Sequence, residues 1–174
     1  EAHGGIDGKT IVFVGDLLRG RTVRSLSSLL TNYKNVKQVF VAPEALQIAS
    51  DITGALKKAR VKFELSDNFR KAIPMADAIY MTRVQDEWDA RKGESKRIDI
   101  SKYCFGTEHL ALLKKDAVIM HPFPRRAEIS PEVDRDPRAM YWRQMRNGMW
   151  VRAALVASIF RRDAEIHEYY EESL

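Results

Sequence analysis

The chain has 174 residues, of which 45% are hydrophobic and 30% are charged, and its lysines and arginines outnumber its aspartates and glutamates by 29 to 24. This size and balance predict one soluble globular domain, and no apolar run is long enough to cross a membrane. The excess positive charge is spread among acidic residues without interleaved aromatics, so we expect no nucleic-acid partner. The single cysteine, Cys104, excludes an internal disulfide and, with no signal-peptide pattern, favours the cytoplasm.

Residues 1–8 are polar and glycine-containing, which predicts a linker tail before a domain that spans residues 9–174. Short, largely apolar runs predict five strands, at residues 11–14, 39–41, 62–65, 78–81 and 117–120. Helical patterns lie between them, at residues 21–35, 44–59, 68–76 and 107–115. This alternation predicts an α/β fold, a Rossmann-like parallel sheet with helices on both faces in a three-layer α/β/α arrangement.

Two segments fall outside the alternation. Residues 138–170 are rich in good helix formers with apolar positions at helical spacing, and we expect one or two closing helices there. Residues 86–97 are charged and contain Gly93, which predicts a mobile loop. Neither segment is a repeat or a low-complexity tract.

The first candidate site follows the first strand, because ligands of open parallel sheets bind beyond the carboxyl ends of the strands. Arg21 opens the next helix, where the dipole and the free N–H groups favour an anion such as a carboxylate. The spacing of Gly15, Gly20 and Thr22 also matches a phosphate loop. However, Arg21 stands where lysine belongs and Asp16 adds negative charge, and both facts argue against phosphate binding. A nucleotide-binding enzyme is therefore kept only as the alternative interpretation.

Two further candidate sites follow the fourth and fifth strands. In an extended segment Arg83 and Gln85 project to the same side, and a guanidinium with an amide donor makes a fork for a carboxylate. In residues 121–125, His-Pro-Phe-Pro-Arg, two prolines stiffen the chain and leave carbonyls free to accept from a substrate amine. A solvated arginine and a rigid structural turn are the alternatives at these two places.

Together these segments closely resemble the C-terminal, aspartate-binding domain of aspartate carbamoyltransferases. The resemblance rests on residues 15–23 (Gly-Asp-Leu, two variable residues, Gly-Arg-Thr-Val), 81–85 (Met-Thr-Arg-Val-Gln) and 121–125, with Glu128-Ile129 following. Asn147-Gly148 and Arg152 also fit the pattern. Ornithine carbamoyltransferases share the fold but have a Cys-Leu-Pro segment after the last strand and lack the Gly-Arg-Thr loop, so the resemblance favours aspartate.

The resemblance implies a role for each motif. Arg21 is expected to bind one carboxylate of L-aspartate, and Arg83 with Gln85 the other. The backbone of Phe123 and Pro124 is expected to contact the reacting amine and the carbamoyl group, with a cis bond before Pro124. The residues expected to support the site are Asp16, Thr22, His121, Arg125 and Arg152.

The implied reaction is carbamoyl transfer from carbamoyl phosphate to L-aspartate, giving N-carbamoyl-L-aspartate and phosphate in de novo pyrimidine biosynthesis. It requires no metal or organic cofactor, and the full-length catalytic chain is expected to be a homotrimer. In the family a separate N-terminal domain with a Ser-Thr-Arg-Thr motif holds carbamoyl phosphate, and no such motif occurs in this sequence. We therefore expect half of the active site to be missing and the isolated chain to be inactive. A non-catalytic binding or scaffold domain of the same fold is the second alternative.

The sequence departs from the family pattern after Gln85. The family usually has Lys-Glu-Arg there, whereas this chain has Asp86, Glu87 and Trp88, which removes positive charge from a loop expected to help close the two domains. The resemblance also implies that the C-terminal helix packs on the N-terminal domain. We expect its unpartnered apolar face to comprise Leu155, Ile159, Phe160, Ile166, Tyr169 and Tyr170.

Overall fold

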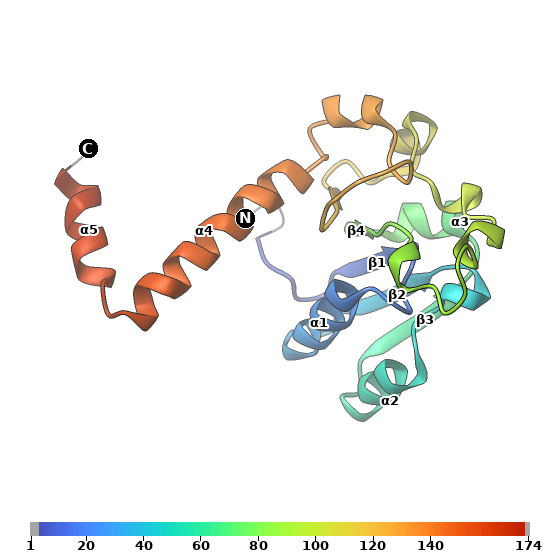
Figure 1. Cartoon of the computed structure of the whole chain (residues 1–174), viewed down its shortest axis with the longest axis horizontal. Helices are drawn as coiled ribbons and strands as arrows, with labels where there is room; N and C mark the ends of the chain where they lie inside the picture. Colours follow the sequence, from blue (N-terminus) through green and yellow to red (C-terminus); the bar gives the residue numbers. More distant parts are fainter. Residues whose placement is uncertain (1–3, 173–174) are drawn as a thin grey trace. The chain divides into compact units, whose positions relative to one another are not determined.

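The computed structural model describes residues 4–172 and divides into two compact units, residues 1–140 and 141–174 (Figure 1). The first unit contains a five-stranded sheet. All of its strands run parallel, in the order β3-β2-β1-β4-β5. Their bounds are β1 (Thr10–Val14), β2 (Lys37–Val41), β3 (Lys62–Ser66), β4 (Ala78–Met81) and β5 (Val118–Met120). The predicted parallel α/β sheet is confirmed, and each predicted strand agrees with an observed one within two residues at either end.

Three α-helices belong to this unit, α1 (Arg21–Leu29), α2 (Ser50–Lys58) and α3 (Phe69–Ala72). In Figure 1 α1 and α2 lie on one side of the sheet and α3 on the other, as expected for a three-layer arrangement. Short 3-10 helices occupy much of the remaining chain: η1 (Leu30–Asn32), η2 (Glu44–Leu46), η3 (Ile73–Met75), η4 (Asp86–Trp88), η5 (Ser95–Arg97), η6 (Ser101–Tyr103), η7 (Thr107–Leu112) and η8 (Pro131–Arg135).

Two of the helix predictions were wrong in detail. The pattern at residues 44–59 is split into η2 and α2, because Gln47 and Ala49 are extended. The Gln47 amide donates to the carbonyls of Phe40 and Ser66, at 3.3 and 3.4 Å, so tertiary hydrogen bonds oppose a continuous helix. The pattern at residues 107–115 is the 3-10 helix η7, not an α-helix.

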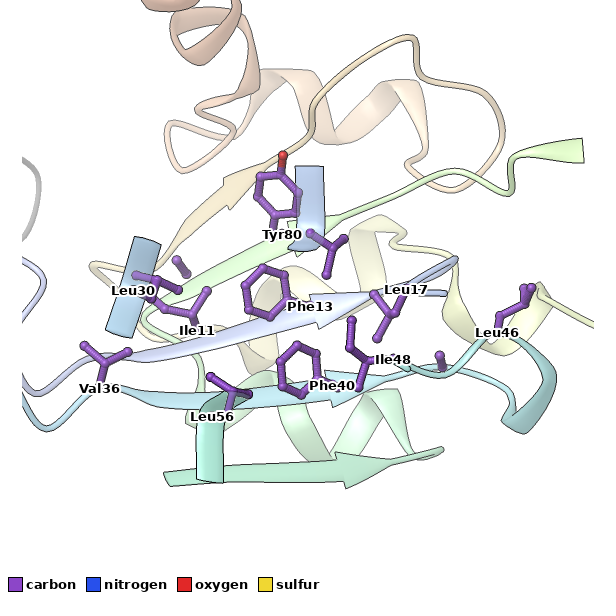
Figure 2. Packing of buried hydrophobic residues seen from close by; sticks show 13 residues of the cluster. Ile11, Phe13, Leu17, Leu30, Val36, Phe40, Leu46, Ile48, Leu56 and Tyr80 are labelled. Atoms are coloured by element: carbon purple, nitrogen blue, oxygen red, sulfur yellow. The ribbon is translucent and has the colours of Figure 1, made fainter. Parts of the chain in front are cut away.

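The main core lies between the sheet and the helices α1 and α2 (Figure 2). Phe13 of β1 stacks on Phe40 of β2 with ring centroids 5.2 Å apart, and Tyr80 of β4 meets Phe13 edge-on at 5.8 Å. Burial of such aromatic side chains stabilises the fold by about 1.5–3 kcal/mol each. One polar pair enters this layer, because Gln38 exchanges hydrogen bonds with Ser27 of α1. The core therefore holds the carboxyl ends of β1 and β4 in fixed positions.

The N-terminal segment is joined to the sheet before β1 begins. Gly8 N–H donates to Lys34 O at 2.8 Å, and Asp7 Oδ1 accepts from Lys34 N–H at 2.8 Å. Residues 1–3 of the expected linker tail lie outside the described residues.

The second unit consists of α4 (Tyr141–Ile159) and α5 (Asp163–Glu172), which agrees with the prediction of one or two closing helices. Between residues 155 and 169 its large apolar side chains are more than half exposed: Leu155, Val156, Ile159, Phe160, Ile166 and Tyr169. The side chain of Tyr170, expected on the same face, lies outside the described residues. No helix in the described part of the chain is both long and apolar enough to cross a membrane.

Candidate functional site

The three candidate segments begin at neighbouring points on one edge of the sheet. Val14, the last residue of β1, pairs with Met81, the last of β4, and Tyr80 pairs with Met120, the last of β5. The strand order reverses between β1 and β4, since β2 and β3 lie on one side of β1 and β4 and β5 on the other. Such a reversal is where open α/β sheets bind their ligands.

The loops after β1 and β4 touch at Gly15. Its φ is +111°, a conformation that favours glycine, and a Cβ at this position would collide with the Thr82 carbonyl. Thr82 donates from both its N–H and its Oγ1 to Val14 O, at 2.8 Å each. The segments after β1 and β4 are therefore held together by hydrogen bonds from Thr82 to the backbone of Val14.

Asp16 is fully buried between these loops. Its Oδ1 accepts from Arg19 N–H at 3.1 Å, and its Oδ2 accepts from Gln85 N–H at 3.0 Å. Burial raises the pKa of Asp16 above its usual value, although the hydrogen bonds from Gln85 and Arg19 oppose that shift. Both carboxylate oxygens of Asp16 thus accept from backbone N–H groups of the two loops, and its supporting role at the site stays a prediction.

Arg21 is the first residue of α1, and Gly20, with no side chain to offer, is the N-cap. The side chains of Arg21 and Thr22 are exposed, whereas Val23 is buried and anchors the helix. Among residues 4–172, Arg21 has no hydrogen-bond or ion-pair partner, and the helix N-terminus beside it adds a partial positive charge. The helix start therefore offers a cationic group that an anion could bind.

Arg83 is already paired. Its guanidinium takes both carboxylate oxygens of Glu87, with Nη1 2.8 Å from Oε2, and it also donates to Val84 O at 3.0 Å. This pair lowers the pKa of Glu87 to about 2. Gln85 is half-buried, and its backbone is held at both N–H and C=O. Arg83 and Gln85 are the two residues of the predicted fork for a carboxylate, but the Arg83 guanidinium is bound to the Glu87 carboxylate.

The loop after β5 is closed by its own side chains. His121 is buried, its Nδ1 accepts from Phe123 N–H at 2.9 Å, and its Nε2 lies 2.7 Å from Glu128 Oε1. Because a backbone N–H can only donate, Nδ1 carries no proton and Nε2 donates to Glu128. The Phe123–Pro124 peptide is cis, so this prediction is confirmed.

Glu128 also accepts from Arg126 N–H at 3.1 Å, and this contact completes the closure of the loop. Burial raises the pKa of Glu128, but the hydrogen bonds from His121 and Arg126 outweigh it, so the pKa is lowered overall. The backbone of residues 121–128 is therefore stabilised in one conformation by the His121 imidazole and the Glu128 carboxylate.

The other predicted supporting residues lie apart from the helix start. Arg125 pairs with Asp134 of η8, with Nη2 3.0 Å from Oδ2, and so fixes the far side of the loop. Arg152 is exposed on α4 in the second unit, and its supporting role stays a prediction. Residues 4–172 contain no cluster of three His, Cys, Asp or Glu side chains arranged to hold a metal ion.

The sequence analysis missed the charged pairs that connect the loops. Arg126 Nη1 lies 2.9 Å from Asp86 Oδ1 and joins the loop after β5 to the loop after β4. Asp86 is one of the departures from the family pattern, and in the structure it is neutralised by Arg126. Arg19 reaches the same loop from the β1 side and pairs with Asp89 at 2.9 Å. The many acidic and basic residues in these loops indicate in the sequence that ion pairs could form. They do not indicate which residues pair.

Comparison with known proteins identifies the family. The profile of the family described as "Aspartate/ornithine carbamoyltransferase, Asp/Orn binding domain" matches residues 7–159. The chain is 42% identical to the chloroplastic aspartate carbamoyltransferase of Arabidopsis thaliana over 158 residues, covering 88% of the chain and 39% of that relative. It is 40% identical to the aspartate carbamoyltransferase catalytic subunit of Vibrio cholerae over 160 residues, covering 91% of the chain and 51% of that relative.

Solved structures agree with this result. The catalytic subunit of M. jannaschii aspartate transcarbamoylase superposes with a TM-score of 0.81 at 35% identity, covering 93% of this chain and 52% of that one. Aspartate transcarbamoylase of Trypanosoma cruzi in complex with N-(phosphonacetyl)-L-aspartic acid superposes with a TM-score of 0.80 at 34% identity, covering 88% and 50%. The chain thus spans between about two fifths and about half of the length of these four relatives. It belongs to the aspartate/ornithine carbamoyltransferase family, and residues 7–159 are its Asp/Orn binding domain.

Proposed function

We propose that this chain is the L-aspartate-binding half of an aspartate carbamoyltransferase, a transferase of de novo pyrimidine biosynthesis. The observation that carries the proposal is that Arg21, at the start of α1, and Arg83, in the loop after β4, both follow strands that are neighbours at the reversal point of the sheet. L-Aspartate carries two carboxylates, and each guanidinium provides a fork suited to one of them. Ornithine has an ammonium group in place of the second carboxylate, so a second cationic group in the site favours aspartate.

The two arginines have different roles in this proposal. Arg21 is exposed at a helix start and can receive one carboxylate directly. Arg83 must exchange or share its contact with Glu87 when the second carboxylate arrives. The Gln85 side chain supplies an amide donor beside it, on a backbone that Asp16 and Arg19 hold in place.

The loop after β5 would present the reacting amine to its partner. Carbonyl oxygens near Phe123 and Pro124 accept from the amine, and the closure of the loop by His121 and Glu128 keeps their direction constant. In the reaction the amine nitrogen forms a bond to the carbamoyl carbon, and the bond from that carbon to the phosphate oxygen breaks. The departing phosphate takes the proton that the amine loses.

In this proposal the binding site for carbamoyl phosphate belongs to a separate domain outside the printed sequence. The chain covers only 39% to 51% of the two relatives named above, and the family profile that it matches is that of the Asp/Orn binding domain alone. This chain alone would then have no residues that position carbamoyl phosphate or stabilise the departing phosphate. It should therefore bind aspartate without transferring a carbamoyl group. The homotrimer and the cytoplasmic location also stay proposals, since the relatives include chloroplastic enzymes.

The phosphate-loop alternative is disfavoured by Asp16. In a phosphate loop the backbone N–H groups face the phosphates, whereas here the Arg19 N–H donates to the buried Asp16 carboxylate. A nucleotide would have to compete with a negative charge already in place. The scaffold alternative shares the fold and differs only in whether aspartate binds.

The test compares two forms of the protein. In the complete enzyme, meaning this chain together with its carbamoyl phosphate-binding domain, we expect transfer of a labelled carbamoyl group to L-aspartate and not to L-ornithine. The 174-residue chain alone should bind L-aspartate in a calorimetric titration and give no transfer. Failure of aspartate to bind or react in the complete enzyme would support the scaffold alternative, and magnesium-dependent nucleotide binding would support the phosphate-loop alternative.

A further inference from the structure

The Arg19 side chain makes three hydrogen bonds at the candidate site, although it occupies one of the two variable positions between Gly-Asp-Leu and Gly-Arg-Thr. Its Nη1 donates to Gln85 O at 3.2 Å, to Asp89 Oδ1 at 2.9 Å and to Ser95 Oγ at 2.7 Å. Only 16% of the side chain is exposed. A surface arginine without a structural role would stay solvated and make none of these contacts.

The segment that Arg19 reaches is folded around Asp89. Asp89 Oδ2 accepts from Ser95 N–H at 3.1 Å, and its Oδ1 accepts from the Ser95 hydroxyl. The Asp89 side chain is 4% exposed, and Ser95 is buried. Among the described residues Arg19 is the one cation within ion-pair distance of Asp89. Residues 89–95 therefore form a small loop that is closed by the contacts between Asp89 and Ser95. The negative charge of Asp89 is paired with Arg19 of the loop after β1.

Arg19 also completes the restraint on Gln85. The N–H of Gln85 donates to Asp16 Oδ2 at 3.0 Å, and its carbonyl accepts from Arg19. Asp16 and Arg19 are themselves joined by the Arg19 N–H and by an ion pair of 3.7 Å. Exposed ion pairs contribute little, but this one lies against a fully buried carboxylate, where solvent screening is weak.

We propose that Arg19 is a positioning residue for the amino-acid substrate, acting through the backbone of Gln85 and through the closed loop of residues 89–95. The inference rests on the proposed function, since Gln85 is there assigned to the second carboxylate of aspartate. Arg19 itself does not touch the substrate. It holds the peptide that carries Gln85 and prevents the segment after it from drifting away from the edge of the sheet.

The test uses Arg19→Met and Arg19→Lys in the complete enzyme, with Arg24→Met as a matched control. Arg24 lies on α1 and pairs with the exposed Asp51 of α2, away from the three loops. We expect Arg19→Met to raise the KM for L-aspartate about tenfold, with a smaller change in kcat and none in the KM for carbamoyl phosphate. Arg19→Lys keeps the charge and should recover part of the affinity, while Arg24→Met should leave all three constants unchanged.

A second readout follows the segment itself. Arg91 and Lys92 are exposed within the closed loop, so trypsin can report on its mobility. Cleavage after these residues should be faster in Arg19→Met than in the parent, and not in Arg24→Met. Should Arg19→Met fail to fold, Asp89→Asn weakens the same ion pair at its other partner and should raise the aspartate KM about threefold.

The outcomes separate the inference from the proposed function. An aspartate KM that rises in Arg83→Ala but is unchanged in folded Arg19→Met and Asp89→Asn would overturn the role of Arg19 and leave the function standing. An unchanged aspartate KM in Arg83→Ala would overturn the function instead. If the inference holds, the effect of the double variant Arg19→Met with Asp89→Asn is smaller than the sum of the two single effects, because the two residues share one ion pair.

Discussion

The buried Asp16 accepts the backbone N–H of Gln85 at 3.0 Å, across 69 residues of sequence. The same carboxylate accepts the N–H of Arg19 with its other oxygen. Asp16, together with Arg19 and the hydrogen bonds from Thr82 to Val14, therefore sets the distance between the loop that leads to Arg21 and the loop that carries Gln85. In the proposed enzyme these are the two sides of the aspartate site, so their spacing is decided before any substrate arrives.

Asp16→Asn should weaken aspartate binding. An amide has one oxygen, so it can accept from Arg19 or from Gln85, while its NH2 group would face the other N–H donor. A buried donor left without a partner costs about 1–3 kcal/mol. We expect a higher KM for L-aspartate in the complete enzyme, measured by steady-state kinetics.

The control for Asp16→Asn is Asp136→Asn, which loses a carboxylate paired with Arg138 outside the three loops. That variant should retain the parent's aspartate KM. Burial raises the pKa of Asp16. The ionised carboxylate therefore lowers the free energy of unfolding at pH values above the ordinary pKa of aspartate, and this loss diminishes as the pH falls through the raised pKa. An Asp16→Asn variant with normal aspartate kinetics would show that the loop spacing does not depend on this carboxylate.

Much of the fold could be predicted because parallel strands buried on both faces are written as continuous apolar runs. Positions such as Phe13 and Ile79 are fully buried, and β1, β2, β4 and β5 follow this pattern, whereas the edge strand β3 contains no buried residue. The helical segment at residues 107–115 could not be predicted correctly, because its form depends on His109. That imidazole accepts from Gly106 N–H and lies 5.4 Å from the rings of Phe69 and Phe105. Phe69 belongs to α3, so a local pattern does not contain this partner.

The candidate site was half predictable for a similar reason. Arg21 and Arg83 could be found because the ends of parallel strands meet at one edge, a rule that needs only the strand positions. The pairing of Arg19 with Asp89 could not, since it joins residues 70 apart and many other carboxylates were equally available in sequence. The occupation of Arg83 by Glu87 was also missed, although a spacing of four residues was a visible signal.

His109 should make the stability of the chain depend on pH. Burial lowers the pKa of His109, so the unfolded state binds a proton more readily than the folded state. The free energy of unfolding should therefore fall as the pH drops below about 6.5, the ordinary value for histidine. Urea unfolding at pH 7 and pH 5 measures this loss.

His109→Asn keeps an acceptor for Gly106 N–H without the titrating ring, so its loss of stability between pH 7 and pH 5 should be smaller than that of the parent. The exposed His167→Asn on α5 is the control for removing one imidazole. An equal loss in the parent and in His109→Asn would contradict this account of η7.

The exposed apolar side chains of α4 and α5 should cause the isolated chain to self-associate. Leu155, Ile159 and Phe160 are each at least 60% exposed, and monomers rarely leave large apolar patches open to water. Light scattering across a concentration series should show a rising mean mass. Phe160→Glu places a charge in the proposed contact and should weaken association, whereas Arg161→Glu changes a neighbouring position that is already polar. A parent that stays monomeric at every concentration would rule out this surface as a contact.

Arg83→Ala in the complete enzyme tests the assignment of the aspartate site most directly. Loss of one charge-assisted carboxylate contact is worth about 1.5–3 kcal/mol, so kcat/KM for L-aspartate should fall roughly tenfold to more than a hundredfold. The KM for carbamoyl phosphate should hardly change, and Arg24→Ala should match the parent. Aspartate kinetics in Arg83→Ala that equal those of the parent would contradict the assignment of this edge of the sheet to L-aspartate.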